Sequence, residues 1–293
     1  MKPVVGTLAI IGCGLIGSSI ARAARRGNAA ARIVVCDADP GARRAIARLG
    51  FADAILASPA KAVAKADMVV ICTPMSTYAA IGRAIGPKLK AGAILSDAGS
   101  VKRAALDRLA PFVPRGVHLV PAHPVAGTEN SGPEAGFAEL FDGRWCIVTP
   151  VAGTPKQATK KVEALWTRLG SKVAVMTPEH HDRVLAITSH VPHLIAYTIV
   201  NTASDLEGTL RAEVIRYSAS GFRDFTRVAA SSPVMWRDIF LANKDAVLEM
   251  LGRLYEDIAL LQKAIRHDEG ETLERLFAKA RHIRRSVVAA KQD

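Results

Sequence analysis

One short segment constrains the fold of this chain more than any other, namely Gly12-Cys13-Gly14-Leu15-Ile16-Gly17. It directly follows the apolar run Thr7–Ile11 and opens an Ala-rich helical pattern. In a strand–turn–helix unit of this kind, the first glycine allows the tight turn, the second lets the backbone approach a pyrophosphate, and the third lets the helix pack on the strand. The helix N-terminus adds free N–H groups and the positive end of the helix dipole. The segment therefore predicts a dinucleotide site at Gly12, Gly14, Leu15, Ile16 and Gly17.

Asp37 indicates which dinucleotide the site binds. It ends the second apolar run, Arg32–Cys36, about 20 positions after Gly17. A carboxylate at this position binds the ribose hydroxyls and repels a 2′-phosphate, so NAD is favoured over NADP. The alternative is an Asp that caps the next helix, but Asp39 before Pro40 already fits that role.

The first half of the chain alternates apolar runs with helical patterns, which predicts an α/β fold: a Rossmann-like, doubly wound, mostly parallel sheet. Two further strand-like runs flank a helical pattern before residue 178, and only helical periodicity follows. We therefore predict a dinucleotide-binding domain at 1–178 and an all-helical domain at 179–293. The predicted strands are Thr7–Ile11, Arg32–Cys36, Met68–Cys72, Ala93–Ser96, Val117–Val120, Trp145–Thr149 and Lys172–Met176.

Several helix starts are marked by a capping side chain before a proline. The four pairs are Asp39-Pro40, Ser58-Pro59, Thr154-Pro155 and Thr177-Pro178.

Polar residues follow three of the predicted strands, where ligands of such sheets bind. Thr73 and Pro74 follow one strand and are expected to contact the cofactor. Ser100 and His123 follow two others, so position alone brings them toward the nicotinamide end of the cleft. A buried, hydrogen-bonded structural histidine is an equally good interpretation of His123.

Two clusters in the helical part carry polar chemistry. Ser189, His190 and His193 interrupt an apolar helix and share a broad face, and Pro192 is expected to bend that helix. No HExxH or cysteine ligand accompanies these histidines, so no metal site is expected.

The second cluster contains Arg223, Asp224 and Arg227. If this segment is helical, the two arginines lie on one face and suit an anionic ligand. A surface ion pair between Asp224 and Arg227 is the alternative of equal weight.

Composition narrows the function classes. The chain has 293 residues, 49% of them hydrophobic, and a formal charge of +12. Such a charge suits either an enzyme for anionic cofactors and substrates or a nucleic-acid binder, although arginine-rich helical stretches are usually solvated faces. Four cysteines without CxxC spacing favour a reduced, cytoplasmic setting. We expect neither a signal peptide nor a membrane span.

Taken together, the motifs resemble the prephenate/arogenate (cyclohexadienyl) dehydrogenase family of tyrosine biosynthesis. The resemblance runs from about residue 7 to about residue 282. The motifs that carry it are Gly12–Ser19, Asp97–Lys102, His123–Glu129, Ser189–His193, Phe222–Arg227 and Ser232–Phe240.

This resemblance implies a reaction and a set of roles. Hydride leaves C4 of a carboxylated cyclohexadienol for NAD, and the ring then loses CO₂ and becomes aromatic, with no metal required. His123 would be the base for the C4 hydroxyl, Ser100 would position it, and Arg227 would bind the ring carboxylate. The remaining implied substrate-pocket residues are Ser189, His190, His193, Arg223, Asp224 and Glu129.

The resemblance also implies a homodimer formed by the helical domain, with Trp236 near the interface and shaping the partner's pocket. We expect no nucleic-acid or membrane partner, and neither a mutase domain before the matched region nor a regulatory domain after it. Two alternatives remain: a non-catalytic NAD-binding sensor, and a two-domain dehydrogenase of the β-hydroxyacid type, which would need a catalytic lysine that the sequence does not clearly provide.

Overall fold

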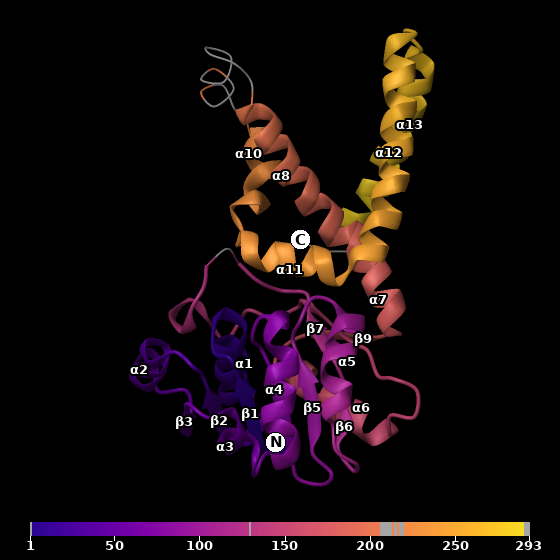
Figure 1. Cartoon of the computed structure of the whole chain (residues 1–293). Coiled ribbons are helices and arrows are strands. Elements are labelled where there is room, and N and C mark those ends of the chain that lie inside the picture. The colour runs from indigo at the N-terminus through magenta and orange to yellow at the C-terminus, as the bar shows by residue number, and fades with distance from the viewer. Residues whose placement is uncertain (1, 129, 206–212, 214–215, 217–219, 290–293) are drawn as a thin grey trace. The chain divides into compact units, whose positions relative to one another are not determined.

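The computed structural model of the chain describes residues 2–128, 130–205, 213, 216 and 220–289, with side chains to residue 286. The chain forms two compact units, residues 1–243 and residues 244–293. Each unit is described by itself below, with the element labels of Figure 1.

A six-stranded, all-parallel sheet organises the first unit, with helices on both of its sides (Figure 1). Its strand order, β3-β2-β1-β4-β5-β6, is that of a Rossmann-like sheet, and the predicted fold class is confirmed. The short strand β3 was not predicted. The strands are β1 (Val5–Ile11), β2 (Ala30–Cys36), β3 (Ala54–Leu56), β4 (Met68–Ile71), β5 (Ile94–Asp97) and β6 (His118–Leu119).

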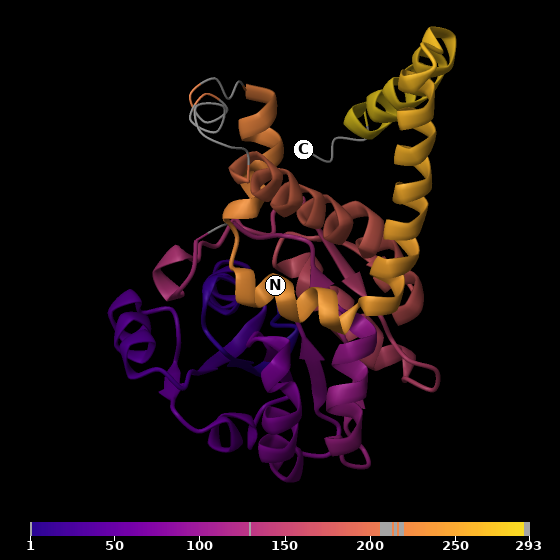
Figure 2. The same ribbon diagram turned by 45° about the horizontal axis from the view of Figure 1, so that its top comes forward.

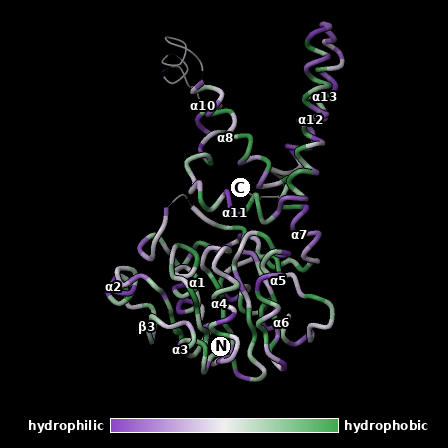
Figure 3. The backbone as a smooth tube through the Cα atoms, viewed as in Figure 1, coloured by the Kyte–Doolittle hydropathy of each residue, from purple (hydrophilic) through white to green (hydrophobic). Residues whose placement is uncertain are grey.

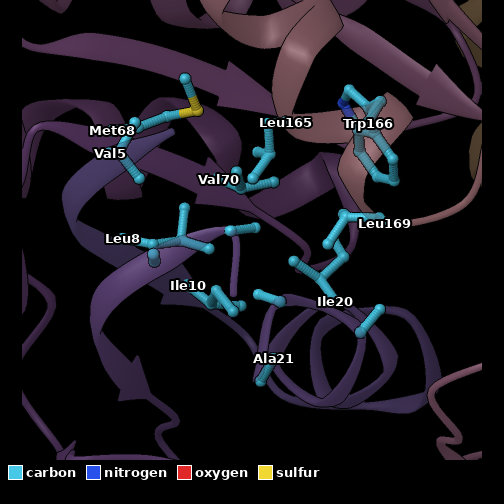
Figure 4. Packing of buried hydrophobic residues seen from close by; sticks show 14 of the residues in the cluster. Val5, Leu8, Ile10, Ile20, Ala21, Met68, Val70, Leu165, Trp166 and Leu169 are labelled. Carbon is cyan, nitrogen blue, oxygen red and sulfur yellow. The ribbon is translucent and has the colours of Figure 1, made fainter. Parts of the chain in front are cut away.

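Alternation along the central strands explains why helices cover both faces. Leu8 and Ile10 of β1 belong to one buried cluster, whereas Ala9 and Ile11 belong to another. Figure 4 shows the first cluster, in which strand side chains meet α1 and α6. The helices of this part are α1 (Leu15–Arg26), α2 (Pro40–Leu49), α3 (Pro59–Val63), α4 (Tyr78–Ile85), α5 (Lys102–Leu109) and α6 (Lys156–Arg168).

A second, three-stranded sheet contains β7 (Ala122–Pro124), β8 (Trp145–Val148) and β9 (Lys172–Val175). The sequence placed His123 just after a strand but did not predict that it lies in a strand of its own, in which β7 pairs antiparallel with β8 and places His123 opposite Ile147. A proline is tolerated here because β7 is an edge strand. His123 is therefore held by a strand ladder.

Three of the four predicted capping pairs are confirmed. The side chains of Asp39, Ser58 and Thr177 accept N–H bonds at the starts of α2, α3 and α7. Thr154 does not cap α6, which begins at Lys156 with the carbonyl of Pro155 accepting the first helical N–H bonds. α6 therefore begins one residue later than the predicted start at Pro155.

After β9, the elements described in the first unit are helical. A π-helical segment joins α7 to α8 just before Pro192, which lies in the first turn of α8. Because proline has no N–H group, the break in α-helical hydrogen bonding falls where the sequence predicted a bend. α8 and α11 lie close to each other in both views (Figures 1 and 2). The elements are α7 (Pro178–Leu185), the π-helix Ala186–His190, α8 (Val191–Ser204), α10 (Ser220–Thr226), the 3₁₀ segment Arg227–Ala230 and α11 (Pro233–Ala242).

The helical stretch Pro178–Ser204 is long and apolar enough to cross a membrane by length and composition alone. Polar residues interrupt it, so its apolar runs are short. Asp182 in its first turns accepts backbone N–H bonds from α5. One stretch of this kind is weak support for a membrane span.

The second unit consists of two helices, α12 (Lys244–Arg266) and α13 (Gly270–Ala289). Green and purple alternate along both helices in Figure 3, so apolar and polar side chains are interleaved. Large apolar side chains remain exposed on both, including Tyr255, Ile265 and Phe277. The pair therefore leaves apolar surface uncovered within the chain.

Candidate active site

The glycine turn has the close contacts that its sequence predicts. Gly12 has a φ of +87°, and a Cβ there would lie 2.6 Å from Cγ2 of Thr73. A Cβ on Gly17 would lie 2.0 Å from the carbonyl oxygen of Gly12. At Gly14 a Cβ would meet nothing within 4 Å, so the backbone is open on that side. No side chain caps α1, which leaves the first-turn N–H groups near Leu15 and Ile16 available for an anion.

Asp37 lines a cavity of about 380 Å³ beside this turn. Its carboxylate accepts N–H bonds from Cys13 (2.8 Å) and Asp39 (2.9 Å), which hold it at the cavity wall. Asp39 caps α2 through Ala42 N–H, so capping of that helix does not require Asp37. The lining residues are Cys13, Gly14, Asp37, Asp39, Gly41, Ala42, Ala45, Arg48, Gly132, Pro133 and Glu134. These features fit the adenosine end of a dinucleotide.

Thr73 and Pro74 follow β4, and Thr73 reaches the glycine turn. The Thr73 methyl group is the atom nearest to a Cβ at Gly12, and the Thr73 hydroxyl lies 2.8 Å from that of Thr77. Pro74 is exposed. Thr73 therefore lies beside the predicted cofactor position, and the role of Pro74 stays a prediction.

His123 is buried, with 8% of its surface exposed, and belongs to a chain of hydrogen bonds. Its Nδ1 lies 2.8 Å from Nε2 of His181, and Nδ1 of His181 lies 2.7 Å from Asp182. Burial, with smaller effects of the charges at His181 and Lys102, lowers the pKa of His123 well below its ordinary value. The imidazole is thus neutral near pH 7 and able to accept a proton.

Sequence reasoning missed His181 and Asp182. The available signal was a histidine–aspartate pair just after the helix start that Thr177-Pro178 marks. Only the fold shows that this helix, α7, runs past both α5 and His123.

Lys102 connects the two sheets beneath the site. Its ammonium group donates to Asp97 (2.6 Å) and to the carbonyl of Ala122 (2.7 Å), and both ionic side chains are fully buried. Tyr78 and the Gly99 N–H also donate to the same Asp97 oxygen. This network fixes the end of β5 against the start of β7.

The predicted polar face of α8 is brought together with α11. His190 is buried; its Nδ1 lies 3.1 Å from Asn243, and its Nε2 has no partner among the described residues. Burial lowers the pKa of His190 to about 4. His193 stacks on Trp236 with ring centroids 3.6 Å apart, and Ser189 lies half-buried one turn earlier.

The ring of Trp236 is buried against His193 of the same chain, and the expected place of Trp236 near a partner's pocket stays a prediction. The π-helical segment and the proline after it turn His193 toward α11, an effect that spacing along an ideal helix does not reveal.

Arg227 lies near His193, whose pKa is lowered by burial and by the positive charge of Arg227. The expected i,i+4 helical face with Arg223 is incomplete, because α10 ends at Thr226 and Arg227 begins a 3₁₀ turn. Arg223 and Asp224 are exposed on α10. The alternative ion pair between Asp224 and Arg227 is not found among the described residues.

The structure shows fewer contacts for the remaining predicted site residues. Ser100 is half-buried just beyond β5, but none of the hydrogen bonds in the described part of the chain joins it to His123. Glu129 lies outside the described residues. Within the described ranges, no group of three metal-ligating side chains is placed to hold a metal ion.

A Rossmann-like sheet with a dinucleotide cradle, together with a neutral buried histidine in the same unit, is typical of a nicotinamide-dependent dehydrogenase. The comparisons with known proteins agree. A model described as "Prephenate dehydrogenase, nucleotide-binding domain" matches residues 20–175, and one described as "Prephenate dehydrogenase, dimerization domain" matches residues 177–279. The chain therefore belongs to the prephenate dehydrogenase family and is an NAD-dependent oxidoreductase.

Individual relatives extend over nearly the whole chain. A cyclohexadienyl dehydrogenase of Zymomonas mobilis is 41% identical over 94% of this chain and 94% of its own length. A prephenate dehydrogenase of Bacillus subtilis is 33% identical over 97% of this chain and 76% of its own length. The crystal structure of Aquifex aeolicus prephenate dehydrogenase with hydroxyphenyl propionate and NAD⁺ superposes with a TM-score of 0.89 at 32% identity, covering 96% of this chain and 98% of that one.

Proposed function

We propose that the chain catalyses the NAD-dependent oxidative decarboxylation of prephenate to 4-hydroxyphenylpyruvate, of arogenate to tyrosine, or of both, in tyrosine biosynthesis. The observation that carries this proposal is the buried, neutral His123, whose Nδ1 is engaged by His181. Relatives named for prephenate and for cyclohexadienyl substrates support the substrate class.

His123 acts as the general base in this proposal. Its Nδ1 is bonded to His181, so its Nε2 is the atom that takes the proton of the C4 hydroxyl. NAD⁺, when bound, supplies the hydride acceptor. The low pKa of His123 keeps it unprotonated, and therefore competent as a base, throughout the neutral range.

Arg227 binds the ring carboxylate in this proposal. It is exposed, lies near His193, and has no carboxylate partner within the described residues, so its charge is available to an anion. A guanidinium suits bidentate carboxylate binding. Loss of CO₂ makes the ring aromatic, which drives the reaction forward.

The other residues complete the pocket. We assign Ser100 to positioning the substrate hydroxyl and the nicotinamide. We assign Ser189, His190, His193, Arg223, Asp224 and Glu129 to the substrate pocket. The cofactor residues are Gly12, Gly14, Leu15, Ile16, Gly17, Asp37, Thr73, Pro74 and Ser100.

We also propose a boundary near residue 178, with the helical part at 179–293 forming a homodimer in the cytoplasm. The exposed apolar side chains of α12 and α13 support an interface between two copies. The match to a dimerisation domain at residues 177–279 supports both the boundary and the dimer. The free thiols of Cys13, Cys36, Cys72 and Cys146 fit a reducing compartment.

NADH absorbance on mixing the purified protein with NAD⁺ and either substrate tests the function. We expect NADH formation with at least one of prephenate and arogenate, and the two kcat/KM values decide the preference. No NADH with either substrate would reject the proposed function. NAD⁺ binding in the absence of any turnover would instead favour a sensor.

A further inference from the structure

His123 is one end of a chain of hydrogen bonds that begins at the N-terminus of α5. The N-cap residue of α5, Val101, provides no side-chain cap. Asp182 from α7 supplies the acceptors instead: its Oδ1 accepts from Lys102 N–H (2.8 Å) and its Oδ2 from Arg103 N–H (2.9 Å). Both carboxylate oxygens are thereby held as acceptors at the positive end of a helix dipole. Burial raises the pKa of Asp182, and the two backbone N–H bonds and the charge of Lys102 oppose that rise.

The direction of each hydrogen bond in this series follows from the Asp182 end. The same Asp182 Oδ1 lies 2.7 Å from Nδ1 of His181, so that nitrogen must carry a proton and donate. In a neutral imidazole the other nitrogen is then an acceptor. Burial lowers the pKa of His181 to about 2, so this imidazole is neutral. Nε2 of His181 therefore accepts.

The acceptor at His181 determines the tautomer of His123. Nε2 of His181 lies 2.8 Å from Nδ1 of His123, so Nδ1 of His123 carries the proton. Its Nε2 is left with a lone pair and has no hydrogen-bond partner in the described part of the chain. A base that must remove a hydroxyl proton needs this tautomer.

We propose that Asp182 and His181 are positioning residues that hold His123 in the Nδ1–H tautomer, so that its Nε2 is always free to accept the substrate proton. Neither residue touches substrate or cofactor in this proposal. The proposal rests on the proposed function, in which His123 is the base. A purely structural interpretation explains Asp182 as the cap of α5, but it does not explain why His181 joins that cap to His123.

The direct test is ¹⁵N NMR of the histidine side chains in the substrate-free protein, with His123 and His181 assigned by single replacements. We expect a protonated Nδ1 and an unprotonated Nε2 for both residues. A proton on Nε2 of His123 would overturn the proposal. This measurement needs no turnover, so it decides the proposal even if neither substrate reacts and the proposed function fails.

A pair of variants tests the consequence for turnover. His181→Leu removes the acceptor, so the Nε2–H form of His123 becomes populated and kcat falls by about tenfold or more while NAD⁺ affinity is kept. His181→Gln retains an acceptor and restores most of that loss. The matched control is His180→Leu at the exposed neighbouring position, which should match the wild type.

The same variants can also contradict the proposal. Wild-type kcat in His181→Leu would contradict the proposal, as would an equal loss in His181→Leu and His181→Gln with unchanged His123 signals. If His181→Leu does not fold, the wild-type NMR signals and His181→Gln still decide between the two interpretations.

Discussion

At the residue scale, His123 and Arg227 differ in burial and therefore in what each can do. His123 is buried and neutral, which suits proton transfer, whereas Arg227 is exposed and charged, which suits binding of an anion. Their positions in the sequence were sufficient to select both as candidates. The partner that orients His123, however, lies 58 residues away and became visible only in the fold.

Replacing each of the two residues should separate turnover from binding. His123→Asn keeps a side-chain donor toward His181 but removes the base, so kcat should fall on the order of 10²–10⁴-fold with little change in KM. Arg227→Ala removes a charged hydrogen bond to substrate and should mainly raise KM, roughly ten- to a hundredfold. Steady-state kinetics measure both. Near-wild-type kcat in His123→Asn would show that the base has been assigned wrongly.

At the element scale, the strand–turn–helix unit was the most predictable part. Its glycine spacing indicated a close approach between β1 and α1, and the lack of room for a Cβ at Gly12 and Gly17 confirms that approach. The strand β7 was missed because Ala122–Pro124 is short and ends in proline, a pattern that indicates a turn. Its strand character comes from pairing with β8, more than 20 residues later.

Two glycine replacements should separate stability from cofactor binding. Gly17→Ala places a Cβ 2.0 Å from the Gly12 oxygen, and this overpacking should cost about 1–3 kcal/mol of unfolding free energy. Gly14→Ala meets nothing in the protein and should leave stability nearly unchanged. It should nevertheless weaken NAD⁺ binding by about tenfold or more, because its methyl group points at the open backbone surface. Urea unfolding and calorimetric titration measure the two effects, and unchanged NAD⁺ affinity in Gly14→Ala would place the dinucleotide elsewhere.

At the scale of the whole molecule, buried neutral histidines make stability depend on pH. Burial lowers the pKa of His190 from 6.5 to about 4 and that of His181 to about 2. Between about pH 6.5 and pH 4 the unfolded chain therefore binds more protons than the folded chain, so stability falls as the pH falls. Each such histidine contributes up to about 1.4 kcal/mol per pH unit.

Urea unfolding at pH 7 and pH 5 measures this dependence. We expect lower stability at pH 5, and a smaller difference in His190→Gln, which removes one of the titrating groups. His180→Gln, at an exposed position, should retain the wild-type difference. Equal stability of the wild type at both pH values would contradict the assignment of these histidines as neutral.

The second unit leads to a prediction about assembly. Ile258 and Ile265 of α12 are more than half exposed, at 53% and 63%. If these side chains form an interface between two copies, Ile258→Glu should lower the measured mass toward that of one chain, 31.2 kDa. Light scattering after gel filtration measures this mass. Lys263→Glu, at an exposed polar position of the same helix, is the control, and a wild type that is monomeric at micromolar concentration would reject the dimer.

The sequence by itself determined the Rossmann-like class, the cofactor turn and most of the residues proposed for the site. These features depend on local patterns, since glycine spacing, alternation and capping act within a few residues. The tertiary structure alone decided the environment of His123. Lys102 joins β5 to β7, and Asp182 of α7 caps α5 while holding His181 against His123. Hydrogen bonds between residues 58 to 80 positions apart leave no periodicity in a sequence, because only the packing of whole elements brings such residues within 3 Å.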